Sequence, residues 1–291
     1  MSRIKSVIIG LLIVILSPAL SGCSALRLGY ANGPQLAWWW IDGYFDFSSE
    51  QAPQLRRALE QWFEWHRATQ LPDYVALLSA ARQQVLEPTT ATQACQWQDR
   101  ARERLEPALA RALVDCAEVL PGLGEAQLKH LEQRYAKVDD EMRADFLQSD
   151  LAERQRLSIK RAVERAERLY GTLDAAQLRL ISAGVIASPF SPERWLAERQ
   201  RRQRDAAQTL RRLISERADR EQRVAALRAL VQRTERSPQP EYRAYQVKLG
   251  DYNCALAAQI HNATTTLQRQ KARDNLQGWE DDLRSIGAPG S

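Results

Sequence analysis

The chain has 291 residues, of which 44% are hydrophobic and 26% are charged, the composition of a globular protein that buries a core. The formal net charge is +5, and two of the positive residues, Arg3 and Lys5, belong to the N-terminal segment described next. The excess that remains is too small to argue for a polyanionic partner.

The first residues form a segment that we expect to be removed from the mature protein. Arg3 and Lys5 make a basic start, residues 7–16 are a nearly unbroken apolar run, and small residues then lead to Leu20-Ser21-Gly22-Cys23. This order is typical of a secretory signal peptide. The apolar run is too short to cross a membrane, which needs about 20 apolar residues.

Leu20-Ser21-Gly22-Cys23 resembles the lipobox of lipid-modified bacterial proteins. The resemblance implies that residues 1–22 are cleaved off and that Cys23 carries acyl chains, which anchor the protein stably in a membrane. Ser24 follows the cysteine, and by analogy with lipoprotein sorting in enteric bacteria this residue favours the outer membrane. We therefore expect a lipid-anchored protein on the periplasmic face of the outer membrane, where nucleic acid is not a partner. An ordinary secretory signal with an incidental cysteine is the alternative.

Aromatic residues dominate the segment that follows the cysteine, residues 23–47. A turn at residues 30–34 precedes three consecutive tryptophans, Trp38, Trp39 and Trp40. One interpretation is an aromatic belt at the membrane interface. The other is a short buried element that closes the end of a helical bundle. Asp42 and Asp46 favour the second interpretation, because acidic residues fit poorly beside an anionic surface.

Beyond residue 47 the chain is rich in strong helix formers, and strand-like alternation is hard to find. Proline and glycine residues mark the breaks between segments. The predicted helices are 48–70, 73–87, 91–118, 124–148, 150–170, 174–187, 191–233 and 241–284. The sequence thus predicts an all-α fold, an elongated multi-helix bundle in which residues 48–291 form a single domain.

The last two predicted helices are the longest, and a continuous helix over 191–233 would extend about 65 Å. Ser191 and Pro192 are good residues for its first turn. Apolar or aromatic residues recur in steps of three and four along 241–284, from Tyr242 to Leu267, and the preceding helix offers Leu210, Leu213, Ile214, Val224, Leu227, Leu230 and Val231. A short connection at 237–240 then predicts a long antiparallel hairpin over 191–284.

A helix-start pattern with a glutamine recurs three times. Ser48 precedes Gln51, Gly124 precedes Gln127, and Asp174 precedes Gln177 at the same spacing. A capping residue and a glutamine three positions later exchange hydrogen bonds in a capping box, although Gly124 has no side chain to contribute. The pattern is similar to the Leu-Thr-x-x-Gln motif of small periplasmic helical chaperones. Three well-capped helices are the simpler interpretation.

Three cysteines, Cys95, Cys116 and Cys254, remain after Cys23, and this odd number allows at most one internal disulfide. On one unbroken helix Cys95 and Cys116 would lie about 30 Å apart, which is beyond disulfide reach, unless the helix breaks near Pro107. We expect three small, buried, unpaired thiols.

The sequence holds no pattern typical of a catalytic or metal site. The three histidines are His66, His130 and His261, and Glu64 beside His66 lies two positions away, so it does not share a helix face with that histidine. No serine-hydrolase, zinc-protease, phosphate-loop or dinucleotide motif is present. We expect no enzymatic activity, no metal and no cofactor.

The densest positive charge falls in the helix predicted at 191–233, at Arg199, Arg201, Arg202 and Arg204. One interpretation is a surface that contacts anionic lipid, lipopolysaccharide or an acidic protein. The alternative is a solvated helix face with internal ion pairs such as Glu198 with Arg202. These arginines and Trp38, Trp39 and Trp40 are the candidate binding surface.

Several short segments resemble a family of proteobacterial lipoproteins defined only by a domain of unknown function. They are Leu28-Gly29-Tyr30, Asn32-Gly33-Pro34, Trp39-Trp40, residues 42–47, Trp65-His66-Arg67, residues 70–74, 130–137 and 165–171, and the resemblance runs from about residue 23 to about residue 285. It implies an all-helical protein anchored in the outer membrane, and it brings no activity or cofactor. We expect a non-enzymatic protein that binds an envelope component or a client polypeptide through a helical surface. A chaperone-like stress protein and an enzyme or accessory factor acting on peptidoglycan or lipid are the alternatives.

Overall fold

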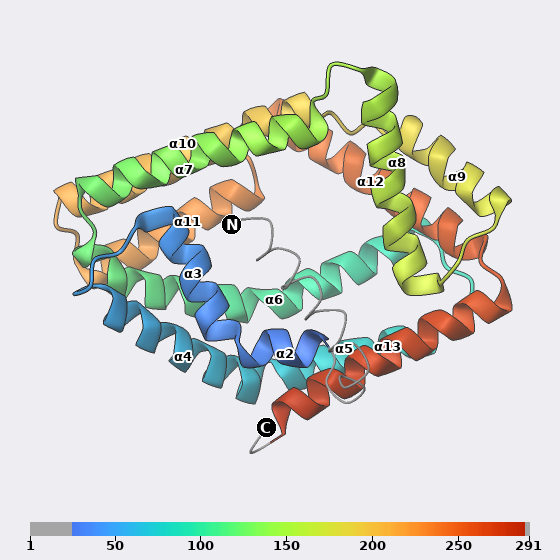
Figure 1. Ribbon diagram of the computed structural model, residues 1–291, viewed down its shortest axis with the longest axis horizontal. Helices are drawn as coiled ribbons and strands as arrows, with labels where there is room; N and C mark the ends of the chain where they lie inside the picture. The colour runs from blue at the N-terminus through green and yellow to red at the C-terminus, as the bar shows by residue number, and fades with distance from the viewer. Residues whose placement is uncertain (1–24, 289–291) are drawn as a thin grey trace, which may run out of the picture.

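The computed structural model describes residues 25–288, so the predicted signal peptide, Cys23 and Ser24 lie outside the described residues. Every regular element within 25–288 is a helix (Figure 1), and the predicted all-α, multi-helix fold is confirmed. No helix in this range is both long and apolar enough to cross a membrane.

The helices follow one another with short connections. They are α2 (Ala25–Ala31), α3 (Gly33–Phe45), α4 (Ala52–Thr69), α5 (Leu71–Gln84), α6 (Ala91–Val119), the short 3-10 helix η1 (Leu120–Gly122), α7 (Glu125–Phe146), α8 (Leu151–Tyr170), α9 (Ala175–Ile186), α10 (Pro192–Ser215), α11 (Arg220–Glu235), α12 (Pro240–Asn262) and α13 (Thr266–Gly287). From α4 to α9 they match the predicted helices to within a few residues. The two helices α2 and α3 occupy a segment for which no helix was predicted.

The helices form an elongated frame with α6 running through it (Figure 1). On one long side α10 packs along α7, and on the opposite side α13 packs along α5. α3 and α4 lie at one end of the frame, and α8, α9 and α12 lie at the other. The first and last described helices also meet, because α2 contacts α13 and Arg27 Nε lies 2.7 Å from a carboxylate oxygen of Asp282.

The C-terminal part differs from the predicted pair of continuous helices. Residues 191–233 are interrupted after Ser215, where Arg217 adopts a left-handed φ of 48° and Asp219 caps the new helix α11. Residues 241–284 are interrupted after Asn262, and Thr265 caps α13. Both interruptions arise because a complete capping box stabilises a new helix start, with Gln222 and Gln268 as the third residues.

Because of these interruptions, the apolar residues that were expected to pack between the two long helices of the hairpin have other neighbours. Leu267 sits in the first turn of α13 with 75% of its surface exposed. The apolar residues of α10 and α11 instead join a core with α6, η1 and α7; its buried members are Ala117, Leu120, Leu123, Leu128, Leu131, Leu210, Leu213, Ala218, Val224 and Leu227. The main core therefore lies at the end of the molecule that also holds α3 and α4.

The recurring glutamines both cap helices and join them in pairs. Gln127 Nε2 donates to Gln51 Oε1 at 3.0 Å, which connects two helix starts that are 76 residues apart. Gln177 and Gln268 exchange side-chain hydrogen bonds of 2.7 and 2.9 Å, and they connect α9 to α13 in the same way. This capping and pairing gives the recurring pattern a structural role.

One disulfide joins two distant helices. Cys95 on α6 is bonded to Cys254 on α12 across a sequence separation of 159 residues, and Cys116 is free. The expectation of three unpaired thiols is therefore wrong. Spacing along the chain gave no signal for this pair, because the two cysteines meet only through the packing of α12 on α6.

Two histidines are held by tyrosines inside the fold. His261 Nε2 donates to the carbonyl of Glu87 at 2.7 Å, so its Nδ1 is the acceptor for the hydroxyl of Tyr170 at 2.9 Å. His66 makes the corresponding 2.9 Å contact with the hydroxyl of Tyr30. Burial lowers the pKa of both histidines, and burial raises the pKa of Tyr170 to about 12.

Stability is expected to fall as pH drops below about 6.5, the ordinary pKa of histidine in an unfolded chain. A histidine whose pKa is lowered by folding binds fewer protons in the folded state, so its stabilising contribution is complete above that pH and is lost on acidification. Protonation of His261 also removes the acceptor for Tyr170, worth about 1 kcal/mol. Melting temperatures between pH 7.5 and 5.5 measure the effect. His261→Gln should flatten the dependence relative to His130→Gln, a variant at the half-buried histidine that contacts the Gly43 carbonyl; equal slopes would contradict it.

Candidate functional site

The arginines of the candidate surface lie on α10, and two of them surround a buried carboxylate. Arg201 donates to both oxygens of Glu198 at 2.9 Å, and Arg202 Nε donates to one of them at 2.9 Å. The Glu198 side chain is only 1% exposed. Burial by itself would raise the pKa of Glu198, and the hydrogen bonds from Arg201 and Arg202 outweigh it and keep the pKa below its usual range.

The third arginine, Arg199, connects α10 to α7. Its Nε donates to Asp139 at 3.1 Å, and Gln203 donates to the same carboxylate oxygen at 2.9 Å. Arg204 is exposed. The ion-pair interpretation is confirmed for Arg199, Arg201 and Arg202, because each contacts a buried or half-buried carboxylate. Since these charges are compensated within the fold, the arginines give little support to a polyanion-binding face.

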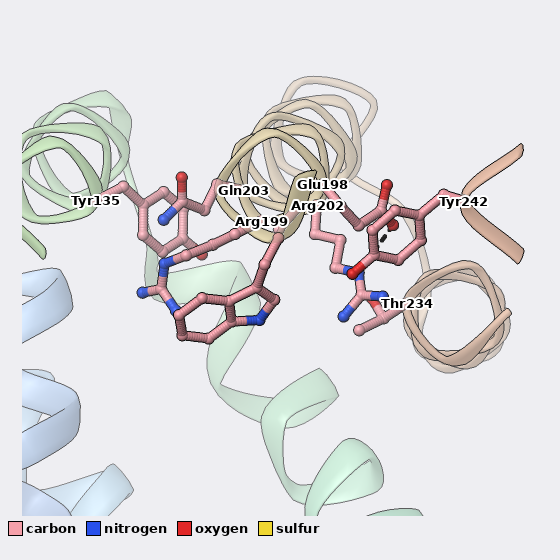
Figure 2. A pocket seen from close by; sticks show the side chains of 9 residues that line it. Tyr135, Glu198, Arg199, Arg202, Gln203, Thr234 and Tyr242 are labelled. Atoms are coloured by element: carbon pink, nitrogen blue, oxygen red, sulfur yellow. Dashed lines mark hydrogen bonds and ion pairs between the residues drawn. The ribbon is translucent and has the colours of Figure 1, made fainter. Parts of the chain in front are cut away.

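Arg199 and Arg202 also line a pocket of about 300 Å³ beneath α10 (Figure 2). Three aromatic side chains, Tyr135, Trp195 and Tyr242, form its walls, and the guanidinium of Arg202 lies 5.8 Å from the centroid of the Tyr242 ring. The pocket combines aromatic faces with a nearly neutral set of charges. Its polar groups hold α7, α10 and α12 together, and this structural role accounts for them.

The three tryptophans of the candidate surface divide between the interior and the surface. Trp38 is 6% exposed; its ring contacts Phe47 at 5.9 Å, and the Arg56 guanidinium lies 4.2 Å above it. Trp39 and Trp40 are 61% and 66% exposed. The interpretation as a buried element therefore applies to Trp38, whereas Trp39 and Trp40 are exposed to solvent.

Further apolar side chains are exposed near Trp39 and Trp40. Leu36 precedes them by three and four positions on α3, so the three residues share one helix face. Leu36 is 47% exposed, and on α2 Leu26 and Leu28 are 41% and 56% exposed. Exposed apolar side chains gathered on two neighbouring helices are typical of a contact with a partner or a membrane.

An apolar cavity of about 390 Å³ lies behind the same part of the chain, between α3, α4, α6 and η1. Among the lining residues only Asp115 and Cys116 are other than apolar or aromatic. The lining consists of Ala37, Trp40, Ile41, Phe45, Phe47, Leu55, Ala58, Leu59, Trp62, Phe63, Ala112, Asp115, Cys116, Val119, Leu120 and Leu123. The polar atom of Trp62 is already used, because its Nε1 donates to the Ala108 carbonyl at 3.2 Å. Asp115 likewise lies 3.3 Å from Arg111.

No pattern singled out in the sequence predicted this cavity. The signal for it was the aromatic run that includes Trp62 and Phe63, next to His66. In the structure His66 stacks on Trp62 with ring centroids 4.7 Å apart. Within residues 25–288 no cluster of three histidine, cysteine or acidic side chains has the arrangement of a metal site.

The free thiol of Cys116 is poorly suited to catalysis. Burial, and then the charge of Asp115, raise the pKa of this thiol, whereas a nucleophilic cysteine needs a lowered one. Cys116 nevertheless keeps solvent-accessible surface at the cavity. It is therefore a reporter of the cavity and not a reactive centre.

A family model supplies the relationship to known proteins. The model of the family of unknown function DUF6279 matches residues 43–243, which is more than half of the chain, so the chain belongs to that family. Neither a curated protein nor a solved structure matches it significantly. The matched range contains α4 and α6 and the end of α3, and therefore most of the cavity lining.

Proposed function

We propose that this member of the DUF6279 family is a non-enzymatic lipoprotein of the bacterial outer membrane. Lipid on Cys23 anchors it, its body faces the periplasm, and α2 and α3 lie against the membrane while the helical body binds an envelope component. The observation that carries the proposal is the set of exposed apolar side chains that begins three residues after Cys23; its members are Leu26, Leu28, Leu36, Trp39 and Trp40.

The residue types of this surface suit a membrane interface. Tryptophan is enriched there because its ring is largely apolar and its N–H stays hydrated. Of the two acidic residues that argued against membrane contact, Asp46 is exposed, and Asp42 is engaged within the protein, since it accepts the backbone N–H of Phe47 at 3.0 Å. The surface therefore presents apolar groups without a competing free carboxylate at position 42.

The position of the anchor supports the same arrangement. Cys23 lies two residues before α2, and two residues span at most about 7 Å when fully extended. An acyl group on Cys23 inserted in a membrane would therefore hold α2 close to the lipid surface. In the sequence only Ser24 and Ala25 stand between Cys23 and Leu26, the first exposed large apolar residue.

The mature chain with Cys23→Ala, which lacks the lipid, is expected to bind vesicles of phosphatidylethanolamine and phosphatidylglycerol through α2 and α3 alone. Replacing Trp39 and Trp40 together by serine should weaken this binding by tenfold or more, because a large apolar side chain contributes about 1.5–3 kcal/mol when fully buried. Flotation of protein with vesicles on a density gradient measures the bound fraction.

The matched control replaces two equally exposed apolar residues at the other end of the molecule. Leu151 on α8 and Val247 on α12 are 63% and 64% exposed (Figure 1). Their double serine variant should float like the parent protein. Equal loss of binding in both double variants, or no binding by the parent, would contradict the proposed membrane contact. In cells, labelled palmitate should be incorporated into the parent chain, and Cys23→Ala should abolish that incorporation.

A further inference from the structure

We infer that the cavity between α3, α4 and α6 binds one acyl chain of a membrane phospholipid. The lining is apolar apart from Asp115 and Cys116, and its volume of about 390 Å³ falls within the range of small-molecule sites, about 300–1,000 Å³. The source of the lipid rests on the proposed membrane contact, whereas the preference for an acyl chain rests on the cavity alone.

The chemistry of the lining selects a ligand without hydrogen-bonding groups. The indole N–H of Trp62 and the carboxylate of Asp115 already have partners within the protein. A polypeptide inserted here would leave its backbone N–H and C=O groups unpaired, which is costly in an apolar site. An aliphatic chain makes no such demand, and each methylene that it buries contributes about 0.8 kcal/mol.

The position of the cavity favours a ligand that arrives from the membrane. Trp40 both lines the cavity and is 66% exposed, next to Trp39 and one helical turn after Leu36. The cavity wall and the exposed apolar surface are thus two faces of the same helix, α3. A lipid whose head group stays at the interface has a short path for one chain to pass beside Trp40.

The test uses the mature chain with Cys23→Ala and the probe 9,10-dibromostearate, whose bromine atoms quench tryptophan fluorescence at short range. The proposal predicts saturable quenching at one probe per protein, because Trp40 and Trp62 both line the cavity. It also predicts that the bound probe slows alkylation of Cys116 by N-ethylmaleimide at least tenfold, read by intact mass. The disulfide leaves Cys116 as the free cysteine of this variant among the described residues.

A matched pair of variants on α6 separates the cavity from the surface. Ala112 lines the cavity, so Ala112→Phe should abolish both the quenching and the protection. Ala110 is exposed on the same helix, so Ala110→Phe should behave like the parent protein. Should Ala112→Phe lower the melting temperature, Ala58→Leu fills the cavity from α4 with a smaller side chain and should also weaken binding.

Three outcomes overturn the proposal: no saturable quenching, unchanged alkylation of Cys116 at saturating probe, or equal binding by Ala112→Phe and Ala110→Phe. The membrane source is tested with the same alkylation readout. Vesicles of phosphatidylglycerol should protect Cys116 in the Cys23→Ala protein; protection only in the lipidated protein would assign the cavity to the chain on Cys23 and overturn the phospholipid source. Vesicle flotation tests the proposed membrane contact separately. A failure of that contact can therefore be distinguished from a failure of the acyl-chain site.

Discussion

Reduction of the Cys95–Cys254 disulfide is expected to lower the free energy of unfolding by up to about 5 kcal/mol. The bond closes a loop between residues 159 apart, and linking such distant residues removes much of the conformational freedom of the unfolded chain. For a protein of this size the loss corresponds to a fall of about 10–20 °C in melting temperature. Thermal denaturation followed by circular dichroism, with and without dithiothreitol, measures it.

Two variants isolate the contribution of this bond. The double variant Cys95→Ser/Cys254→Ser should melt at the lower temperature without reductant and should not respond to dithiothreitol. Cys116→Ser, which alters the free cysteine, should keep the response of the parent protein. Identical melting of the double variant and the parent under oxidising conditions would show that the cross-link contributes nothing to stability.

Removing both partners of the buried carboxylate of Glu280 should cost about 3–5 kcal/mol. The Glu280 side chain on α13 is 0% exposed, and it is compensated by Arg82 of α5 at 3.5 Å and by Arg284 at 2.5 Å. Arg82→Met and Arg284→Met together keep most of the apolar stem of each side chain but leave a buried charge without a partner. Urea denaturation at pH 7.5 measures the loss.

The charge itself is tested by a third substitution. Adding Glu280→Gln to the two methionine variants removes the unpaired charge and should recover a large part of the lost stability. Glu280→Gln alone should cost less than the double methionine variant, because both arginines are partly exposed and remain solvated. If Glu280→Gln gives no recovery, then the stability was lost through packing and not through the buried charge.

The positions of most helices were predictable because proline, glycine and capping residues act locally. Asp174 with Gln177 started α9 as expected, and the same local logic applied to Asp219 with Gln222 would have divided the predicted hairpin. Helical composition continues through the break, and this continuity concealed the local signal. The contact of Cys95 with Cys254 and the ion pairs of Glu280 depend on which helices are neighbours, and a periodic pattern on one helix does not specify its neighbour.

The candidate site could be predicted only in part, again because one segment of the sequence does not specify which helices are its neighbours. The arginine run and the tryptophan cluster were visible as composition, but burial assigned Trp38 to the interior and Trp39 and Trp40 to the surface. The carboxylate that compensates Arg199, Asp139, lies on another helix, 60 residues away. The cavity is assembled from α3, α4 and α6, and no single segment carries its pattern.

The meeting of the first and last described helices has a consequence for how the protein is divided experimentally. The family match ends at residue 243, yet Cys254 and α13 lie outside it and contact α6 and α5 within it, and the Arg27–Asp282 contact joins two helices that both lie outside it. A fragment cut at the family limits would lose one half of the cross-link and expose Leu71, now 2% exposed against α13. By contrast, a circular permutant that joins the neighbouring ends and opens a surface loop elsewhere would keep all of these contacts. The evolutionary match and the cooperative unit thus have different boundaries.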